Sequence, residues 1–262
     1  MKILCTGSEG FIGGHLYNKL KQNHKVYGFD RNKNRDLLNL GDLAEIFLEV
    51  KPDIVIHLAS NISDDVNDCG NDVIALLNLL AFCKEFEVKK FIFTSSAAVY
   101  GNSYPRTLPI NPYGISKLQC EHWCEYYAKE YGINVVIMRL GNVYGKNGKG
   151  VINQFITRVK NNEPLIIYGN GHQSRDYVWI EDIINIIVKC IPYNYSGTFE
   201  VGTGIDSEIW DVINILNNQP LTIQHQPPIQ NEIKKSILKN SDVNLFLMGN
   251  DFYHFISLKE GI

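Results

Sequence analysis

The first half of the chain alternates short apolar runs with longer amphipathic segments. Five nearly continuous apolar runs predict strands that are buried on both faces: Lys2–Cys5, Lys25–Phe29, Ile54–Leu58, Lys90–Thr94 and Asn134–Arg139. Helical spacing of apolar residues covers the stretches between them: Gly10–Gln22, Gly41–Val50, Asp72–Glu87 and Pro112–Tyr131. This alternation predicts an α/β protein of the Rossmann type, in which a doubly wound parallel sheet is built with right-handed crossovers.

The pattern changes after Gly145, where glycine, proline and asparagine separate shorter elements. We therefore expect a dinucleotide-binding domain over residues 1–145 and a smaller α/β substrate lobe over 146–179 and 202–262. Residues 180–201 are expected to return to the first domain, with a helix over Ile180–Cys190 and a strand over Thr198–Val201.

Composition narrows the class of protein. The chain has 262 residues, 45% of them hydrophobic, and a net charge of −3, so no broad basic surface indicates nucleic-acid binding. We expect a cytoplasmic protein, because its start lacks a signal peptide and no apolar run reaches the length of a membrane span. Its cysteines form no C-x-x-C pair and are expected to be reduced and buried. A zinc site at Cys120, His122 and Cys124 is disfavoured because His122 points away from the face that the two cysteines share, so no metal site is expected.

A glycine-rich loop follows the first predicted strand. Gly7, Gly10 and Gly13 give the spacing G-x-x-G-x-x-G between a strand and a helix. In that position Gly7 permits a tight turn, Gly10 allows the backbone to approach a pyrophosphate, and Gly13 lets the helix pack on the strand. The helix N-terminus offers free N–H groups to the anion, which predicts dinucleotide binding.

Asp30 ends the second predicted strand, where a carboxylate can accept hydrogen bonds from the adenosine ribose of the dinucleotide. A 2'-phosphate would be repelled by Asp30, and also by Glu9 if that side chain faces the ribose. Arg31 argues the other way. We expect NAD rather than NADP as the cofactor.

Candidate catalytic residues lie on the fourth strand and the helix that follows it. Ser96 ends the strand run, and Tyr113 and Lys117 share one helix face at i and i+4. A free phenol, with a pKa of about 10, is a poor base at neutral pH. Two positive charges, the Lys117 ammonium and the oxidised nicotinamide, favour the phenolate, so that Tyr113 could exchange a proton with a sugar hydroxyl while Ser96 hydrogen-bonds the same oxygen.

These motifs resemble the extended short-chain dehydrogenase/reductase family, in its NAD-dependent sugar-nucleotide epimerase/dehydratase branch. Thr6–Gly13 matches T-G-x-x-G-F-I-G, and Ser95–Gly101 resembles S-S-x-x-V-Y-G. Asp36-Leu37 resembles the family's third-strand end, whose Asp contacts adenine, and His57–Ser60 resembles its H-L-A-A segment beside the cofactor. The resemblance implies NAD contacts at the following residues: Gly7, Glu9, Gly10, Phe11, Ile12, Asp30, Arg31, Asp36, Leu37, Leu58, Ala59, Ser60, Thr94, Tyr113, Lys117 and Leu140.

The resemblance also implies a substrate site. Ser96 and Tyr113 would face the sugar, Asn142 in R-x-x-N-V-Y-G would touch the diphosphate or sugar, and Arg175 would meet the nucleotide diphosphate. The alternative for Arg175 is a structural salt bridge to Asp176 or Asp182. Where many members carry R-P-G-E/D, this chain has Ile229–Glu232, so the second diphosphate arginine is absent, although Glu232 could still meet a ribose.

Three functions stay open from the sequence. A sugar-nucleotide 4-epimerase would move hydride at C4 and recycle its NAD. A sugar-nucleotide 4-keto reductase, consuming external NAD(P)H, is favoured by the short segments Ser60–Asn71 and Asn102–Asn111 and by the missing arginine. The third is a non-catalytic dinucleotide-binding regulator on the same fold. Ala97 and Ala98 replace the Asp and Glu of the dehydratases and disfavour water elimination. The family's dimer implies a homodimer through a four-helix bundle, with no nucleic-acid or membrane partner.

Overall fold

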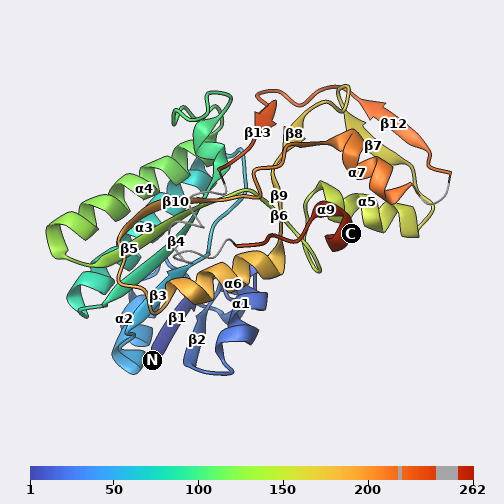
Figure 1. Ribbon diagram of the computed structural model, residues 1–262. Coiled ribbons are helices and arrows are strands. Elements are labelled where there is room, and N and C mark those ends of the chain that lie inside the picture. The colour runs from blue at the N-terminus through green and yellow to red at the C-terminus, as the bar shows by residue number, and fades with distance from the viewer. Residues whose placement is uncertain (218–219, 240–252) are drawn as a thin grey trace.

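The computed structural model describes residues 1–217, 220–239 and 253–262. Its centre is a six-stranded parallel sheet in the order β10-β5-β4-β3-β1-β2 (Figure 1). The strands are β1 Lys2–Thr6, β2 Lys25–Phe29, β3 Ile54–His57, β4 Lys90–Ser96, β5 Asn134–Leu140 and β10 Gly197–Val201. The prediction of a Rossmann-type α/β fold is confirmed.

Helices cover both faces of this sheet, which explains why its strands are apolar throughout. On one face α1 (Phe11–Leu20) and α6 (Ile180–Cys190) pack against side chains such as Ile3 and Cys5. On the other face α2 (Leu40–Val50), α3 (Val66–Glu85) and α4 (Pro112–Tyr131) pack against Leu4 and its neighbours. Successive residues of β1 thus alternate between two separate cores, as strand geometry requires.

A smaller lobe lies at the right of Figure 1. It contains β6 Asn142–Tyr144, α5 Val151–Lys160, β7 Leu165–Tyr168, β8 Ser174–Arg175, β9 Tyr177–Trp179, β11 Ser207–Glu208, α7 Ile209–Leu216, β12 Ile223–Gln226, β13 Lys235–Ser236 and α9 Leu258–Gly261. Its strands form three short sheets, β11-β8-β13, β12-β7 and β6-β9. A core of its own, which includes Phe155, Leu165 and Val212, holds these pieces together.

Two details differ from the sequence prediction. First, α3 begins at Val66 and not at Asp72, because the side chain of Asp65 accepts hydrogen bonds from the N–H groups of Asn67 and Asp68 and so caps an earlier, polar first turn. Second, the expected strand end at Asp36-Leu37 is wrong. Residues 30–39 form a 3-10 turn, η1 Arg31–Lys33, and a loop into α2, which leaves β2 at the edge of the sheet.

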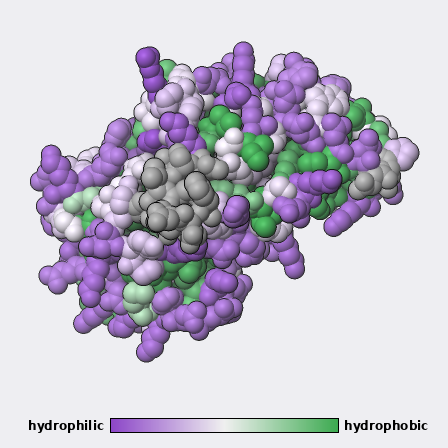
Figure 2. Space-filling model, in the orientation of Figure 1, coloured by the Kyte–Doolittle hydropathy of each residue, from purple (hydrophilic) through white to green (hydrophobic). Residues whose placement is uncertain are grey.

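Helix α3 is long and apolar enough, by length and composition, to cross a membrane, a test that the core helices of many proteins also pass. The sequence analysis had expected no apolar run of that length. Large apolar side chains also remain exposed on α3 and α4, among them Ile74, Ile115, Trp123 and Tyr126. On the face drawn in Figure 2, by contrast, hydrophilic residues cover most of the surface and hydrophobic ones gather in small groups.

Candidate active site and cofactor cavity

The glycine loop joins β1 to α1 in the geometry that its spacing predicts. Gly7 has φ +69°, a left-handed conformation that favours glycine, and a Cβ on Gly13 would lie 1.9 Å from the carbonyl oxygen of Gly7. Gly10 is the N-cap of α1 with no side-chain cap, and the first turn of that helix carries no acid. The free N–H groups and the positive end of the helix dipole are therefore suited to an anion. Phe11 and Ile12 form the first turn of α1.

A cavity of about 200 Å³ opens beside this loop. Nine predicted cofactor residues line it: Gly7, Gly10, Asp30, Arg31, Asp36, Leu37, Leu58, Ala59 and Ser60. The sequence analysis missed its other lining residues, which are Phe29, Arg35, Asn61, Asp72 and Ala75. Although Asp36 does not end a strand, it lies in the cavity where an adenine contact was expected.

The charged side chains around Asp30 are already ordered. Its two carboxylate oxygens each accept a backbone hydrogen bond at 3.0 Å, one from the N–H of Glu9 and one from the N–H of Asn32. Arg31 pairs with Asp36 at 3.3 Å, and Lys33 pairs with Glu9 at 2.9 Å. The basic side chains nearest in sequence to Asp30 are thus directed to other acids, and the Asp30 carboxylate lines the cavity.

Asp72 is the clearest residue that sequence reasoning missed. Its carboxylate accepts hydrogen bonds from the Ser60 hydroxyl at 2.6 Å and from the backbone N–H of Asn61 at 2.8 Å. It thereby fixes the segment that follows β3 along the cavity wall. A signal was present, since Asp72 is the first residue of the predicted helix, but an acid at a helix start is normally a dipole or capping residue.

The three candidate catalytic residues come from β4 and α4. Ser96 ends β4, and its hydroxyl oxygen accepts a hydrogen bond from the N–H of Ala98 at 3.1 Å, so that Ser96 caps the 3-10 turn η2 Ala97–Tyr100. Lys117 is 5% exposed and donates to the carbonyl oxygen of Thr94 at 3.0 Å. Its Nζ lies 5.7 Å from the centroid of the Tyr113 ring. Lys117 therefore joins the catalytic helix to the strand that presents Ser96.

A buried histidine lies behind this lysine. The Nδ1 atom of His57 is 2.7 Å from the hydroxyl oxygen of Thr6. Burial, with a further contribution from Lys117, lowers the pKa of His57 to about 3. The histidine is therefore neutral at ordinary pH.

Three of the five predicted substrate residues meet in a second cavity, of about 270 Å³, in the smaller lobe, whereas Ser96 and Tyr113 do not line it. Asn142, Arg175 and Glu232 all line it, together with Val151, Gln154, Phe155, Ile166, Ile167, Tyr168, Gln173, Tyr177, Ile209 and Ile229. In the β6-β9 pair Asn142 lies opposite Tyr177, and Arg175 precedes Tyr177 by two residues. Asn142 and Tyr177 therefore reach the cavity from the β6-β9 pair, whereas Arg175 reaches it from β8 and Glu232 from the segment before β13, the strand that pairs with β8.

Arg175 has a different acidic partner from those considered in the sequence. Its Nη2 lies 3.4 Å from the Glu232 carboxylate, whereas Asp176 accepts hydrogen bonds from Thr203 and Gly204. Asp182 accepts from Tyr253 and from the N–H of Ile256. The salt bridge to Asp176 or Asp182 is therefore wrong. Burial lowers the pKa of Arg175, and Glu232 offsets part of this effect.

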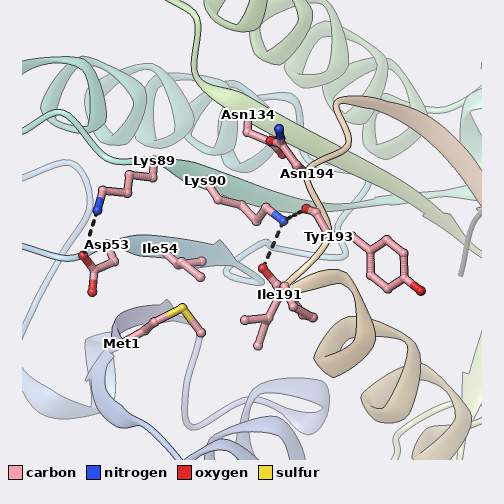
Figure 3. A pocket seen from close by; sticks show the side chains of 10 residues that line it. Met1, Asp53, Ile54, Lys89, Lys90, Asn134, Ile191, Tyr193 and Asn194 are labelled. Atoms are coloured by element: carbon pink, nitrogen blue, oxygen red, sulfur yellow. Dashed lines mark hydrogen bonds and ion pairs between the residues drawn. The ribbon is translucent and has the colours of Figure 1, made fainter.

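Another cavity, of about 240 Å³, lies at the opposite end of the sheet and has a structural explanation (Figure 3). There the Lys90 ammonium donates to the carbonyl oxygens of Cys190, Ile191 and Tyr193. These carbonyls follow the C-terminal end of α6, where a cation is favoured. Lys90 thus fastens α6 to the sheet, far from the carboxyl ends of the strands where ligands of such folds bind.

Comparison with known proteins gives a consistent result. Residues 3–202 match the family model described as the NAD dependent epimerase/dehydratase family. The chain is 30% identical to the Bacillus subtilis protein named uncharacterized UDP-glucose epimerase YtcB, over 83% of this chain and 82% of that one. Two solved structures each cover 100% of this chain and 96% of their own: a Thermotoga maritima UDP-glucose 4-epimerase with UDP-glucose (TM-score 0.90, 28% identity) and a Thermus thermophilus UDP-glucose 4-epimerase with NAD (TM-score 0.89, 27% identity).

Proposed function

Because the chain belongs to the NAD-dependent epimerase/dehydratase family, whose members act on nucleotide sugars, we propose that it is a sugar-nucleotide 4-epimerase. The observation that carries the proposal is the Lys117–Thr94 hydrogen bond, which holds the Tyr113/Lys117 helix against the strand that ends in Ser96. The strand β4 lies in the same sheet as β1, which leads into the glycine loop. Its neighbour β5 is followed directly in the chain by β6, which carries Asn142.

The residues present fit NAD. The cradle of Gly7 and Gly13, the uncapped N-terminus of α1 and the ordered Asp30 carboxylate provide a pyrophosphate site and a ribose acceptor. When bound, NAD would supply a reversible acceptor for the hydride of the sugar carbon. Thr94 and Leu140 are near the carboxyl ends of β4 and β5, where the nicotinamide half of the cofactor would lie.

The chain's own residues would then transfer one proton, that of the C4 hydroxyl. Tyr113 removes the proton of the C4 hydroxyl at its phenolate oxygen and later returns it to the same oxygen. Lys117 stabilises the phenolate from the same helix face, and the Ser96 hydroxyl donates to the sugar oxygen as its charge changes. Arg175 and Asn142 hold the diphosphate while the keto sugar turns, and Glu232 accepts a hydrogen bond from a ribose hydroxyl.

The test begins with the cofactor content of freshly purified protein, read by absorbance and mass spectrometry after denaturation. NAD retained near one per chain is the expected result, because an epimerase recycles its cofactor. The protein is then incubated with UDP-glucose, UDP-N-acetylglucosamine and UDP-glucuronic acid without added cofactor, and the C4 epimers are followed by NMR. No epimer from any of these nucleotides would overturn the proposal.

A 4-keto reductase is the second candidate. The segments that would wall the sugar, residues 58–65 between β3 and α3 and residues 101–111 between η2 and α4, are short. A protein that is purified empty and binds reduced cofactor reversibly, with turnover of a 4-keto sugar nucleotide, would favour this reaction.

We also propose that the enzyme is a cytoplasmic homodimer in which α3 and α4 of each subunit form a four-helix bundle. The support is the apolar surface of these helices, where Ile74, Ile115, Trp123 and Tyr126 are each at least 40% exposed. Light scattering at micromolar concentration should give twice the mass of the chain, and Trp123→Glu should give a monomer. A monomeric wild-type protein would remove this proposal.

A further inference from the structure

A buried network of polar side chains lies directly behind the Ser96 turn. Its first member, Glu121, is 1% exposed and continues the catalytic stripe of α4, since Tyr113, Lys117 and Glu121 recur every four residues. The Glu121 carboxylate accepts a hydrogen bond from the hydroxyl of Ser95, the residue before Ser96. The catalytic helix is therefore joined to the catalytic strand at two levels, through Lys117 to Thr94 and through Glu121 to Ser95.

Arg139 extends the network to the neighbouring strand. It stands opposite Ser95 in the β4-β5 pair, and its guanidinium makes a bidentate contact with Glu121, with Nη2 2.6 Å and Nε 3.0 Å from the carboxylate oxygens. A third nitrogen, Nη1, donates to the Tyr100 hydroxyl at 2.7 Å. Burial disfavours the Arg139 charge, but the hydrogen bonds that Arg139 donates to the Glu121 carboxylate outweigh this effect and raise the arginine's pKa.

Tyr100 connects the network to the C-terminal part of the chain. It is the last residue of η2, the turn that Ser96 caps, and its hydroxyl donates to the Glu200 carboxylate on β10. Glu200 also accepts from the Tyr104 hydroxyl at 3.1 Å and from the backbone N–H of Lys239 at 2.7 Å. Both ends of the Ser96 turn are thus tied down, one by the serine cap and the other by the tyrosine hydroxyl.

Such an arrangement is costly unless it is complete. Charged groups out of water need partners, and removing one partner of a buried pair is strongly destabilising. An apolar packing of similar size could hold the same elements together, so stability alone gives a weak reason for two buried acids and an arginine here. Glu121, Arg139 and Glu200 have one property in common. Each contacts Ser95 or Tyr100, the residue before Ser96 and the last residue of the turn that Ser96 caps.

We propose that Glu121, Arg139 and Tyr100 are positioning residues, which fix the Ser96 turn relative to Tyr113 and Lys117. The proposal rests on the 4-epimerase function proposed above and adds residues that do not touch the substrate. Because a displacement of about 1 Å can cost about 100-fold in rate, loosening the turn lowers kcat, whereas the KM and the NAD affinity depend on other residues and stay unchanged.

The sharpest variant is Tyr100→Phe, which removes one hydroxyl and keeps the ring. Its matched control is Tyr104→Phe, which removes the other tyrosine hydroxyl on Glu200, keeps the ring that packs on Tyr100, and leaves the Arg139–Tyr100 hydrogen bond in place. Tyr100→Phe should lower kcat by about 10- to 100-fold with KM and NAD affinity unchanged, and Tyr104→Phe should stay within about twofold of wild type. Equal effects of the two variants, or a loss confined to KM, would overturn the proposal.

Glu121→Gln tests the other end of the network, because glutamine keeps an acceptor for Ser95 and loses the charge that pairs with Arg139. Its kcat should fall at least as far as that of Tyr100→Phe. If it does not fold, the tyrosine pair decides the question alone.

A second readout needs no substrate and separates this proposal from the proposed function. Hydrogen exchange is measured by mass spectrometry on NAD-bound protein, for peptides that span 95–101 and 112–121. Faster exchange in these peptides in Tyr100→Phe, but not in Tyr104→Phe, supports the positioning role even if the wild type converts no sugar nucleotide. Unchanged exchange overturns it, whatever the epimerase assay shows.

Discussion

The cavity beside the glycine loop, here called the cofactor cavity, and the cavity that Arg175 lines in the smaller lobe, here called the substrate cavity, are assembled in different ways. The first depends on backbone: a glycine turn, an uncapped helix end and strand ends within the first 75 residues of the chain. The second depends on side chains from segments that span residues 142 to 232. Its ion pair joins Arg175 to Glu232, which are 57 positions apart in the chain. Local geometry therefore determines the shape of the first cavity, whereas tertiary packing determines which side chains line the second.

The proposed proton transfer at Tyr113 should be the step most sensitive to change. Tyr113→Phe removes the proton acceptor and should lower kcat by about 10³-fold, the middle of the range for general acid–base catalysis. NAD should remain bound, as checked by mass spectrometry of the denatured protein. Tyr131→Phe, at the far end of the same helix, is the control, and a similar loss there would contradict the assignment.

The glycine loop should tolerate no side chain where the helix meets the strand. In Gly13→Ala the new Cβ would lie 1.9 Å from the Gly7 carbonyl oxygen, so we expect a loss of about 3 kcal/mol in the free energy of unfolding and loss of NAD binding. In the neighbouring Gly14→Ala, the nearest atom to the new Cβ is at 3.9 Å, and helix propensity should make this variant neutral or slightly stabilising. Urea unfolding and NAD titration of the two variants compare them directly, and equal behaviour would contradict the backbone argument.

A side-chain change in the substrate cavity should alter affinity alone. Arg175→Gln removes the guanidinium that would bind the diphosphate, and KM should rise by about 10- to 30-fold, the equivalent of about 2 kcal/mol for a charged hydrogen bond. The NAD affinity and the melting temperature should change little, because the ion pair with Glu232 at 3.4 Å is loose. A variant that also loses NAD would show that the two cavities are not independent.

The smallest effect is expected at His57, on the cofactor side of the sheet. Its pKa is lowered to about 3 in the folded chain, compared with 6.5 when unfolded, so the unfolded state binds an extra proton between these values and stability falls as the pH drops below 6.5. The loss is about 1.4 kcal/mol at a pH of about 5.5. Denaturant unfolding at several pH values should show a shallower dependence in His57→Asn, and identical slopes would contradict the buried neutral histidine.

The same division explains what could be predicted from the sequence. Gly7, Gly10 and Gly13 act through spacing along a few residues, and Tyr113 and Lys117 through one turn of helix, so a linear pattern is enough to find them. The pairing of Arg175 with Glu232 arises only when β8 and the segment before β13 meet, which no local pattern describes. Asp176 and Asp182 are nearer to Arg175 in the sequence, but their carboxylates accept hydrogen bonds from the backbone N–H groups of Gly204 and Ile256.

The expected strand at Asp36 failed for a related reason. The resemblance placed Asp36 at a strand end, but the chain between β2 and α2 is occupied by η1 and its loop. The carboxylate nevertheless lines the cofactor cavity. The loop thus brings Asp36 to the cavity although it does not lie at a strand end.

The path of the chain between its two parts has a practical consequence. The smaller lobe begins at β6, but the chain then returns to the main sheet, where α6 covers one face and β10 forms an edge strand. After β10 it enters the smaller lobe a second time. A polypeptide truncated after residue 145 would therefore leave β5 as an unpaired edge strand. It would also expose to solvent the side chains of β1 and α1 that α6 covers. Aggregation of such a fragment follows from an unprotected strand edge and bare apolar surface. Exchange of the lobe between related enzymes must accordingly use at least three junctions, one before β6 and one on each side of the segment 180–201.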